Sequence, residues 1–393
     1  MHGSGKAQKI GLVAPYFPPH IGGANIYCHE LAKALAEKGR EVHVFAHRNA
    51  QGAGGYTLHP ILKLDLDEDL AQLARFDMDV WHSLFFFYAP LALSQRNVFI
   101  TGHGDDFYSF RIRRTLPARA FVRQHLLWRL PQAAQRPIER WLQGAELRMN
   151  RRLYRRAVQR ARHLIAVSTF SKKRLCTLFP EASEKTSVIP PGVATRFFDG
   201  SEVPREKHLF LTVTRLDETD RIKNVHGVIQ ALGELKDTYD FRYRVIAGAV
   251  TGGYRRELEQ MIVEKGLSQK VSIEGRKTED ELADCYARAD LFILASYAES
   301  RNFEGFGIVF LEANAAGTPV LTTREGGMVD YVREGVNGYF TESPSAAGLQ
   351  TAIRRYLDGE IGFDRAQVRR APESYRWTHI ADRVLGVYAA YGT

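Results

Sequence analysis

The stretch EGFGIVFLEANAAGTPV, residues 304–320, decides how this chain is interpreted. A glycine-rich turn follows Glu304, and IVFLEANAAG is typical of a short helix that ends at Gly317 and Pro319. Even in one continuous helix, Glu304 and Glu312 would lie about 12 Å apart at 1.5 Å per residue. Paired catalytic carboxylates of glycosidases lie about 5 to 9.5 Å apart. We therefore expect the two glutamates to hold opposite ends of one elongated ligand.

The start of this predicted helix is a candidate anion site. Phe306, Gly307 and Ile308 form its first turn, where unpaired backbone N–H groups and the helix dipole favour a negative charge. A ligand with hydroxyls at both ends and phosphate in the middle is a nucleotide sugar. The same pattern is equally typical of a solvated helix glutamate at 312 and a turn carboxylate at 304, so the residues alone leave both alternatives open.

Outward from this stretch, short β-branched runs alternate with amphipathic helical stretches along nearly the whole chain, which is typical of parallel α/β domains. The 393 residues exceed the size at which one hydrophobic core stops growing, about 250 to 300 residues. We expect two Rossmann-like doubly wound domains, at 8–190 and 191–374, that face a central cleft. The sequence SVIPPGVATRFF is the predicted linker. Neither domain carries GxGxxG after its first strand, which disfavours a dinucleotide-dependent oxidoreductase.

Positive charge is concentrated in one segment. The formal net charge is +9, and residues 111–162 alone hold 15 arginines against two glutamates, a balance of +13. Basic amphipathic helices that bear tryptophan, here Trp128 and Trp141, bind anionic membrane surfaces and phosphate. We expect a helical insertion at about 108–162. It either docks on the cytoplasmic leaflet or grips a phosphorylated lipid-linked acceptor, or else forms a helical subdomain with a solvated basic face or a dimer contact.

Other classes of protein find little support. Cys28, Cys176 and Cys285 stand far apart without a CxxC pair, which argues against a disulfide framework or a zinc site. No signal peptide is recognised, and no apolar run approaches the ~20 residues that span a bilayer. No nucleic-acid-binding module accompanies the basic charge, so no nucleic-acid partner is expected. These observations predict a cytoplasmic protein, peripheral on the cytoplasmic face of the membrane if the insertion docks there.

Several motifs occur in one order along the chain. They are PYFPPHIGGANIYCHELAKAL, TGHGDD, IPPGV, TVTRLDETDRIKN, EGFG followed by LEA and GTPV, and SYRWTHIADRVLGVY. Together they resemble the motifs of the retaining glycosyltransferases of family 4, which share the two-domain GT-B fold. Pro191 stands where the linker motif of the family usually has asparagine. The resemblance implies a GT-B architecture in which residues 375–393 form a helix that crosses back to the first domain.

The resemblance also implies roles for the matching residues of the second domain. Arg215 and Lys223 would bind the diphosphate and neutralise charge on the departing nucleotide diphosphate, so that neither a metal nor another cofactor is needed. Glu304 would bind a hydroxyl of the donor sugar, and Glu312 the ribose hydroxyls. Because the interval from Arg215 to Lys223 is longer than in many relatives, Arg221 could share the cationic role.

In the first domain, Gly22 and Gly23 would let backbone amides of the first helix approach the phosphate or the acceptor. His103 would lie near the reacting centre and contact the donor sugar. The aromatic run Phe85–Tyr88 could line an acceptor pocket or belong to the core, and both alternatives are open. The predicted catalytic residues are Glu304, His103, Arg215 and Lys223.

The implied reaction moves a sugar from a UDP- or GDP-sugar to a glycan, a lipid-linked acceptor or a small molecule, with retention at the anomeric carbon. Since no carboxylate is placed as a covalent nucleophile, front-face substitution is favoured, with the departing phosphate oxygen taking the acceptor proton. Two other functions stay open. A nucleotide-sugar epimerase or hydrolase of the same fold would turn over the donor without an acceptor, and a non-catalytic basic protein would dock on membranes or polyanions without binding nucleotides.

Overall fold

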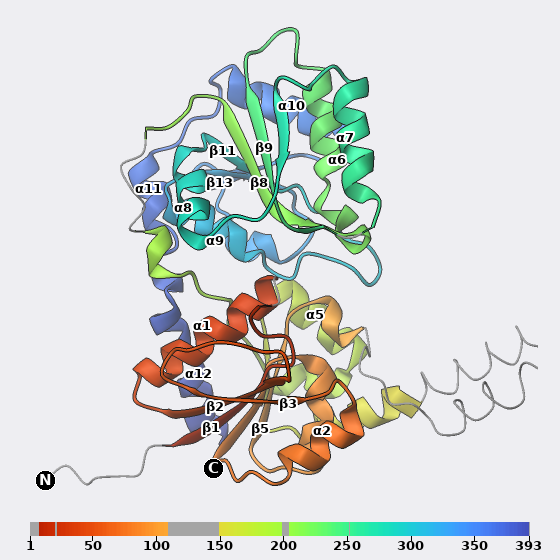
Figure 1. The fold of residues 1–393 in the computed structure, drawn as a ribbon, viewed down its shortest axis with the longest axis vertical. Coiled ribbons are helices and arrows are strands. Elements are labelled where there is room, and N and C mark those ends of the chain that lie inside the picture. The colour runs from red at the N-terminus through yellow and green to blue at the C-terminus, as the bar shows by residue number, and fades with distance from the viewer. Residues whose placement is uncertain (1–7, 20–21, 109–148, 199–203, 251, 393) are drawn as a thin grey trace, which may run out of the picture.

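The computed structural model describes residues 8–19, 22–108, 149–198, 204–250 and 252–392. The chain forms two Rossmann-like α/β domains, each built on a parallel sheet, and Figure 1 shows the N-terminal domain below the C-terminal one. This arrangement confirms the predicted α/β GT-B fold class. Most of the predicted arginine-rich insertion lies outside the described residues, so its helical nature stays a prediction.

The N-terminal sheet has the strand order β3-β2-β1-β4-β5-β6-β7, and its paired strands are parallel. The strands are β1 (Lys9–Val13), β2 (Glu41–His47), β3 (Thr57–Leu62), β4 (Val80–Ser83), β5 (Val98–Gly102), β6 (His163–Ala166) and β7 (Thr186–Val188). The helices are α1 (Gly23–Glu37), α2 (Leu66–Leu73) and α5 (Thr169–Leu178), with the 3-10 helices η1 (Phe86–Leu93), η2 (Asp105–Phe107), η4 (Pro180–Lys185) and η5 (Thr195–Phe197). The order reverses between β1 and β4, and α1 begins at that reversal, where open α/β sheets bind ligands.

The C-terminal sheet repeats this plan with the order β10-β9-β8-β11-β12-β13. Its strands are β8 (Leu209–Leu216), β9 (Arg242–Val250), β10 (Val271–Glu274), β11 (Leu291–Ile293), β12 (Val320–Thr322) and β13 (Gly338–Phe340). Its helices are η6 (Glu218–Lys223), α6 (Val225–Gly233), α7 (Tyr254–Glu264), α8 (Glu279–Arg288), α9 (Ile308–Ala315), η7 (Gly327–Asp330), α10 (Ala346–Leu357), α11 (Arg365–Arg370) and η8 (Glu373–Tyr375). The loop that leads to α9 leaves β11, next to the reversal between β8 and β11. The stretch that opened the sequence analysis thus lies at the ligand-binding edge of this sheet.

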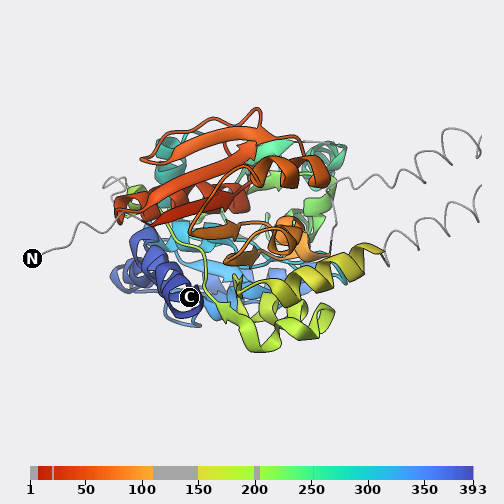
Figure 2. The ribbon, with the colours of Figure 1, turned by 90° about the horizontal axis from the view of Figure 1, so that it is seen from below.

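The last helix, α12 (Trp377–Tyr391), returns to the N-terminal domain, where it lies beside α1 in Figure 1 and along the sheet in Figure 2. Its apolar face joins the core of that domain through Trp377, Ile380, Val384 and Tyr388. A hydrogen bond adds to this apolar contact, since His82 Nδ1 lies 2.6 Å from the Tyr388 hydroxyl. The two ends of the chain therefore share one core.

The aromatic run after β4 belongs to that core. Phe85, Phe86, Phe87 and Tyr88 are all buried, with at most 5% of their surface exposed. Residues 149–160 form a helix that packs beside the run, and its Tyr154 hydroxyl donates to the carbonyl of Phe87 at 2.6 Å. The core alternative for the run is confirmed, and these rings do not line an open acceptor pocket.

Two further expectations concern the whole chain. In the described ranges, no helix combines the length and the apolar character that crossing a membrane requires. Cys28, Cys176 and Cys285 are free thiols, and Cys28 and Cys285 are buried.

The buried contact of α12 generates a stability prediction. His82 is fully buried, and burial lowers its pKa to about 3, so its ring is neutral and needs partners on both nitrogens. Its Nε2 pairs with Thr101 Oγ1 at 2.8 Å, and its Nδ1 with Tyr388. Tyr388→Phe leaves Nδ1 unsatisfied, which is expected to lower the free energy of unfolding by about 1 to 3 kcal/mol in urea titrations. Tyr391→Phe is the control, because the Tyr391 side chain is 44% exposed. Equal effects of the two changes would contradict the prediction.

Candidate active site

An ion pair joins two predicted site residues that are far apart in the sequence. The Lys223 ammonium, at the end of η6, contacts the Glu304 carboxylate in the loop before α9. Glu304 is only 8% exposed, and its backbone is fixed by a bridge to Gly326, with the Gly327 N–H donating to the Glu304 carbonyl at 2.9 Å. Glu304 is therefore a turn carboxylate, but a buried and paired one, and its role in binding a sugar hydroxyl stays a prediction.

Arg215 lies beside this pair and is held by an acid that the sequence analysis missed. At the end of β8, its Nε and Nη2 lie 3.1 and 3.2 Å from the Asp220 carboxylate oxygens. Asp220 is 5% exposed. Burial raises the pKa of Asp220, while Arg215 and Lys223 act in the opposite direction. Two cations and two carboxylates thus balance one another at this end of the C-terminal sheet.

Arg221 is paired with other carboxylates than Arg215 and Lys223 are, and a share in the cationic role stays a prediction. Its guanidinium pairs with Glu218 at 2.8 Å and with Glu257 at 2.5 Å, and it stacks over the Tyr254 ring at 4.6 Å. These contacts hold Arg221 against the start of α7. The longer interval between Arg215 and Lys223 therefore places Arg221 in a separate ion-pair network.

The N-terminus of α9 faces the N-terminus of α1 across the two domains. Gly307 precedes α9 with φ 87°, and any Cβ there would collide with the Phe310 ring, so the turn requires glycine. On the opposite side, a methyl group on Gly23 would lie 3.8 Å from Ile308 Cδ1, and one on Gly22 would lie 3.7 Å from Arg215 Nη1. The structure thus brings both glycines, Arg215 and Ile308 together. Phe306 points elsewhere, since it is 3% exposed and packs on Tyr331 and Tyr375.

His103 reaches the same region from the N-terminal domain. Its backbone N–H donates to Asp106 Oδ1 at 2.9 Å, and its ring Nε2 lies 2.8 Å from the Leu84 carbonyl oxygen. The carbonyl of His103 lies so close to Gly305 that a Cβ on Gly305 would overlap it. His103 and the loop that carries Glu304 are therefore in direct contact.

Glu312 lies apart from this cluster, inside the C-terminal domain. It is 4% exposed, and the Tyr286 hydroxyl donates to its Oε2 at 2.8 Å. Burial raises the pKa of Glu312 to about 7, whereas the bond from Tyr286 and the charge of Arg196 act to lower it. The alternative of a solvated helix glutamate is wrong. A role in binding ribose stays a prediction.

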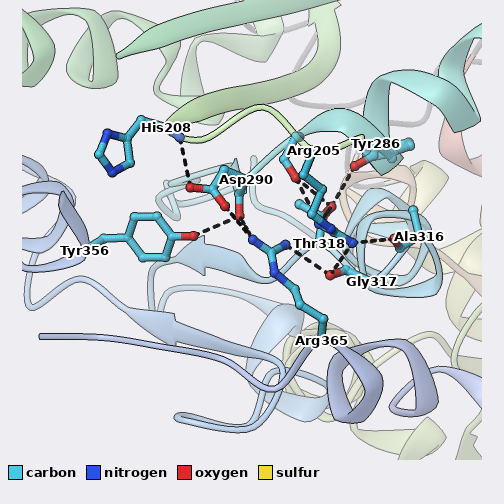
Figure 3. Close-up of polar contacts among 10 residues, drawn as sticks. Arg205, His208, Tyr286, Asp290, Ala316, Gly317, Thr318, Tyr356 and Arg365 are labelled. Atoms are coloured by element: carbon cyan, nitrogen blue, oxygen red, sulfur yellow. Dashed lines mark hydrogen bonds and ion pairs between the residues drawn. The ribbon is translucent and has the colours of Figure 1, made fainter. Parts of the chain in front are cut away.

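The far end of α9 is anchored by arginines, as Figure 3 shows. Arg205 donates to the carbonyls of Ala316 and Gly317 at 3.0 and 3.1 Å, and Arg365 donates to Gly317 at 3.2 Å and to Asp290 Oδ1 at 2.5 Å. Cations at a helix C-terminus complement the helix dipole and satisfy carbonyls without an intrahelical partner. The helix that carries Glu312 is thus fixed at the end opposite the candidate site.

Further residues that the sequence analysis missed join the two domains around the site. Arg196, in η5, pairs with Glu30 of α1 and with Glu279 of α8. Asp330 accepts hydrogen bonds from the backbone N–H and the hydroxyl of Thr169, both at the start of α5. Asp220 and Asp106 stood within quoted motifs, each close in sequence to its partner, Arg215 or His103. The pairs of Arg196 and Asp330 join distant segments and leave no signal in a single sequence.

The candidate site is a cluster of charged side chains between the two domains, with cations that suit an anion and carboxylates that suit hydroxyls. Within the residues that the structure describes, no three His, Cys, Asp or Glu side chains lie close enough together to hold a metal ion. The charged groups that do converge are Arg215, Lys223, Asp220 and Glu304. Two Rossmann-like domains that meet at such a cluster have the arrangement of a glycosyltransferase of the GT-B type.

Comparisons with known proteins agree with this class. The family "Glycosyltransferase Family 4" matches residues 21–197, and "Glycosyl transferases group 1" matches residues 194–374. The two matches run consecutively through both domains, and the chain belongs to the glycosyltransferases of family 4.

Individual relatives are similar over nearly their whole length. A D-inositol 3-phosphate glycosyltransferase of Nocardiopsis dassonvillei is 28% identical, with 94% of this chain and 90% of that protein covered. Among solved structures, sucrose-phosphate synthase from Thermosynechococcus elongatus superposes with a TM-score of 0.70 at 20% identity and 98% coverage of both chains. Anabaena HepE in complex with UDP and glucose gives a TM-score of 0.69 at 19% identity, with 98% of this chain and 100% of that chain covered. These two structures are similar in fold.

The buried carboxyl of Glu312 generates a pH prediction. Its pKa rises from an ordinary 4.5 to about 7 on folding, so the folded state holds the proton more tightly. The free energy of unfolding therefore falls as pH rises from 4.5 to 7, by about 3 kcal/mol from this group. Glu312→Gln keeps an acceptor for Tyr286 and removes the titration. Urea unfolding at pH 5 and pH 8 is expected to show the variant gaining stability relative to the wild type at the higher pH. An unchanged difference at the two pH values would contradict this.

Proposed function

We propose that the chain transfers a sugar from a nucleotide-diphosphate sugar to an acceptor, with retention at the anomeric carbon and without a metal ion. The observation that carries the proposal is the Lys223–Glu304 ion pair. Glu304 lies in the loop just before the N-terminus of α9, and this loop contacts His103 of the other domain. This arrangement puts a cation for phosphate and a carboxylate for hydroxyls beside the free amides of a helix N-terminus.

The donor diphosphate would lie against Arg215, Lys223 and the first amides of α9. Fixed cations contribute most where charge develops, and here that is the departing nucleotide diphosphate. When the phosphate engages Lys223, the Glu304 carboxylate becomes available to accept hydrogen bonds from the sugar hydroxyls. Glu312, at the next turns of the same helix, would accept from the ribose. The complex of HepE with UDP and glucose supports UDP-sugars as the first donors to test.

The acceptor would enter from the N-terminal domain, past Gly22, Gly23 and His103. The name of the Nocardiopsis relative supports a small phosphorylated polyol among the glycan, lipid-linked and small-molecule acceptors that the sequence leaves open. Contact with an anionic membrane surface through residues 111–162 is proposed from their composition alone, since residues 109–148 are not among those described.

Retention follows in this proposal from front-face substitution. Glu304 pairs with Lys223 until the phosphate engages that lysine, and the released carboxylate then binds a sugar hydroxyl instead of attacking the anomeric carbon. The bond from that carbon to the phosphate oxygen breaks while the bond to the acceptor oxygen forms on the same face. The phosphate oxygen takes the acceptor proton, so Arg215 and Lys223 stabilise the leaving group throughout.

A donor panel tests the proposal. The purified chain is titrated with UDP-, GDP-, ADP- and dTDP-sugars, read by thermal shift with and without EDTA, and the anomeric configuration of the product is read by NMR. One donor is expected to give a saturable shift that EDTA does not change. Lys223→Ala is expected to weaken the binding of that donor about tenfold or more, because a charge-assisted hydrogen bond to its phosphate is lost. Lys207→Ala is the control, since Lys207 is exposed and has no side-chain partner among the described residues.

Three outcomes would contradict the proposal. If no donor gave a saturable shift of the melting temperature, the chain would have no donor site of the proposed kind. Donor turnover at the same rate with and without acceptors would favour an epimerase or hydrolase. Inversion at the anomeric carbon would exclude the front-face mechanism.

A further inference from the structure

A cavity lies outside the candidate active site, where the rest of the C-terminal domain meets the segment that leads into α12. Its volume is about 320 Å³. One side comes from the turn between η7 and β13, with Tyr331 and Arg333. The other side comes from α11 and the residues after it, with Gln367, Arg370 and Tyr375. This volume is near the lower end of the range for small-molecule sites, about 300 to 1,000 Å³.

The two arginines of this cavity are not neutralised by a neighbour. In the described part of the chain, neither the Arg333 nor the Arg370 side chain has a hydrogen bond or an ion pair, and both are exposed at the mouth. The nearest acids in the sequence are already engaged. Glu334 pairs with Arg324, and Glu373 pairs with Arg376 at 2.8 Å. The third, Asp330, is engaged by Thr169, as described above. The cavity therefore has an excess of positive charge.

The remaining lining adds neutral donors and an aromatic wall. Gln367 is exposed and contributes a side-chain amide for which the described residues offer no partner. Tyr331 and Tyr375 lie edge to face with centroids 5.2 Å apart, and burial raises the pKa of both hydroxyls, so both rings are neutral. The Tyr331 hydroxyl already donates to Asn314 Oδ1 at 2.7 Å, so this residue offers the cavity only its ring. Guanidinium groups bind phosphate oxygens in a bidentate manner, and the ring edges suit a small apolar or sugar body.

We propose that this cavity binds a small phosphate-bearing anion of the size of a sugar monophosphate, separately from the active site. Arg333 and Arg370 would hold the phosphate from the two sides, and the tyrosines would contact the rest of the ligand. Its position matters for the domain arrangement. The Tyr375 carbonyl accepts from the Val193 N–H of the linker at 2.9 Å, and both tyrosine rings pack on Phe306 beside Glu304. A ligand here joins the segment before α12 to the domain that carries the α9 loop.

The test uses the full chain with Arg215→Ala and Lys223→Ala combined, which removes the cations of the proposed donor site. Inorganic phosphate, ribose 5-phosphate and ribose are titrated by isothermal calorimetry at low ionic strength. Saturable binding of phosphate and ribose 5-phosphate, with none of ribose, is expected. Adding Arg333→Gln or Arg370→Gln is expected to weaken that binding about tenfold, because each removes a charged hydrogen bond to the phosphate.

Arg256→Gln is the matched control, because Arg256 is exposed on α7, has no side-chain partner among the described residues, and loses the same charge. Arg333→Lys is expected to recover part of the affinity. The absence of saturable phosphate binding would overturn the proposal. Phosphate binding that is equally strong in the Arg333→Gln, Arg370→Gln and Arg256→Gln variants would overturn it as well. The latter result would place the phosphate elsewhere on the chain. Because the donor-site cations are absent from every protein tested, the result does not depend on the proposed function.

Discussion

Parallel strand pairing is the constraint on which this molecule depends. Each strand must be followed by a crossover before the next can pair, so the helices that follow the strands begin at one edge of the sheet. Here two such edges face one another, and the helices next to the two reversal points, α1 and α9, point their N-termini at each other. The glycines at both starts allow the close approach that brings Arg215 to Gly22 and Ile308 to Gly23.

The charges placed at that meeting point are balanced before any substrate arrives. Arg215 pairs with Asp220, and Lys223 pairs with Glu304. Both carboxylates are buried, whereas the Arg215 side chain is 43% exposed. A buried charge without a partner is costly, so each carboxylate needs its cation while no ligand is bound. In the proposed function, a diphosphate takes the place of the carboxylates beside the cations, and the acid released from Lys223 is the one proposed to bind the donor sugar. On this proposal, the two ion pairs keep the cations in place and leave Glu304 ready for a hydroxyl.

The sequence predicted the features that local chemistry controls. The turn at Gly307, the helix from Ile308 and the alternation of strands and helices follow from glycine, proline and apolar periodicity. The family resemblance singled out Arg215, Lys223 and Gly23, and the structure brings these residues near the Glu304 loop from two facing sheet edges. What escaped prediction depends on partners distant in the sequence. The contacts of Arg221 with Glu257 and of Glu312 with Tyr286 join residues from different helices and loops, so helix periodicity cannot show them.

A crystal structure of the chain with bound UDP would show whether the two ion pairs open for a diphosphate. The proposed donor site predicts the β-phosphate within hydrogen-bond distance of the Lys223 ammonium and the Ile308 amide, with the Glu304 carboxylate released from Lys223. It also predicts the ribose hydroxyls within reach of Glu312. A diphosphate bound elsewhere, with the Lys223–Glu304 and Arg215–Asp220 pairs both intact, would contradict it.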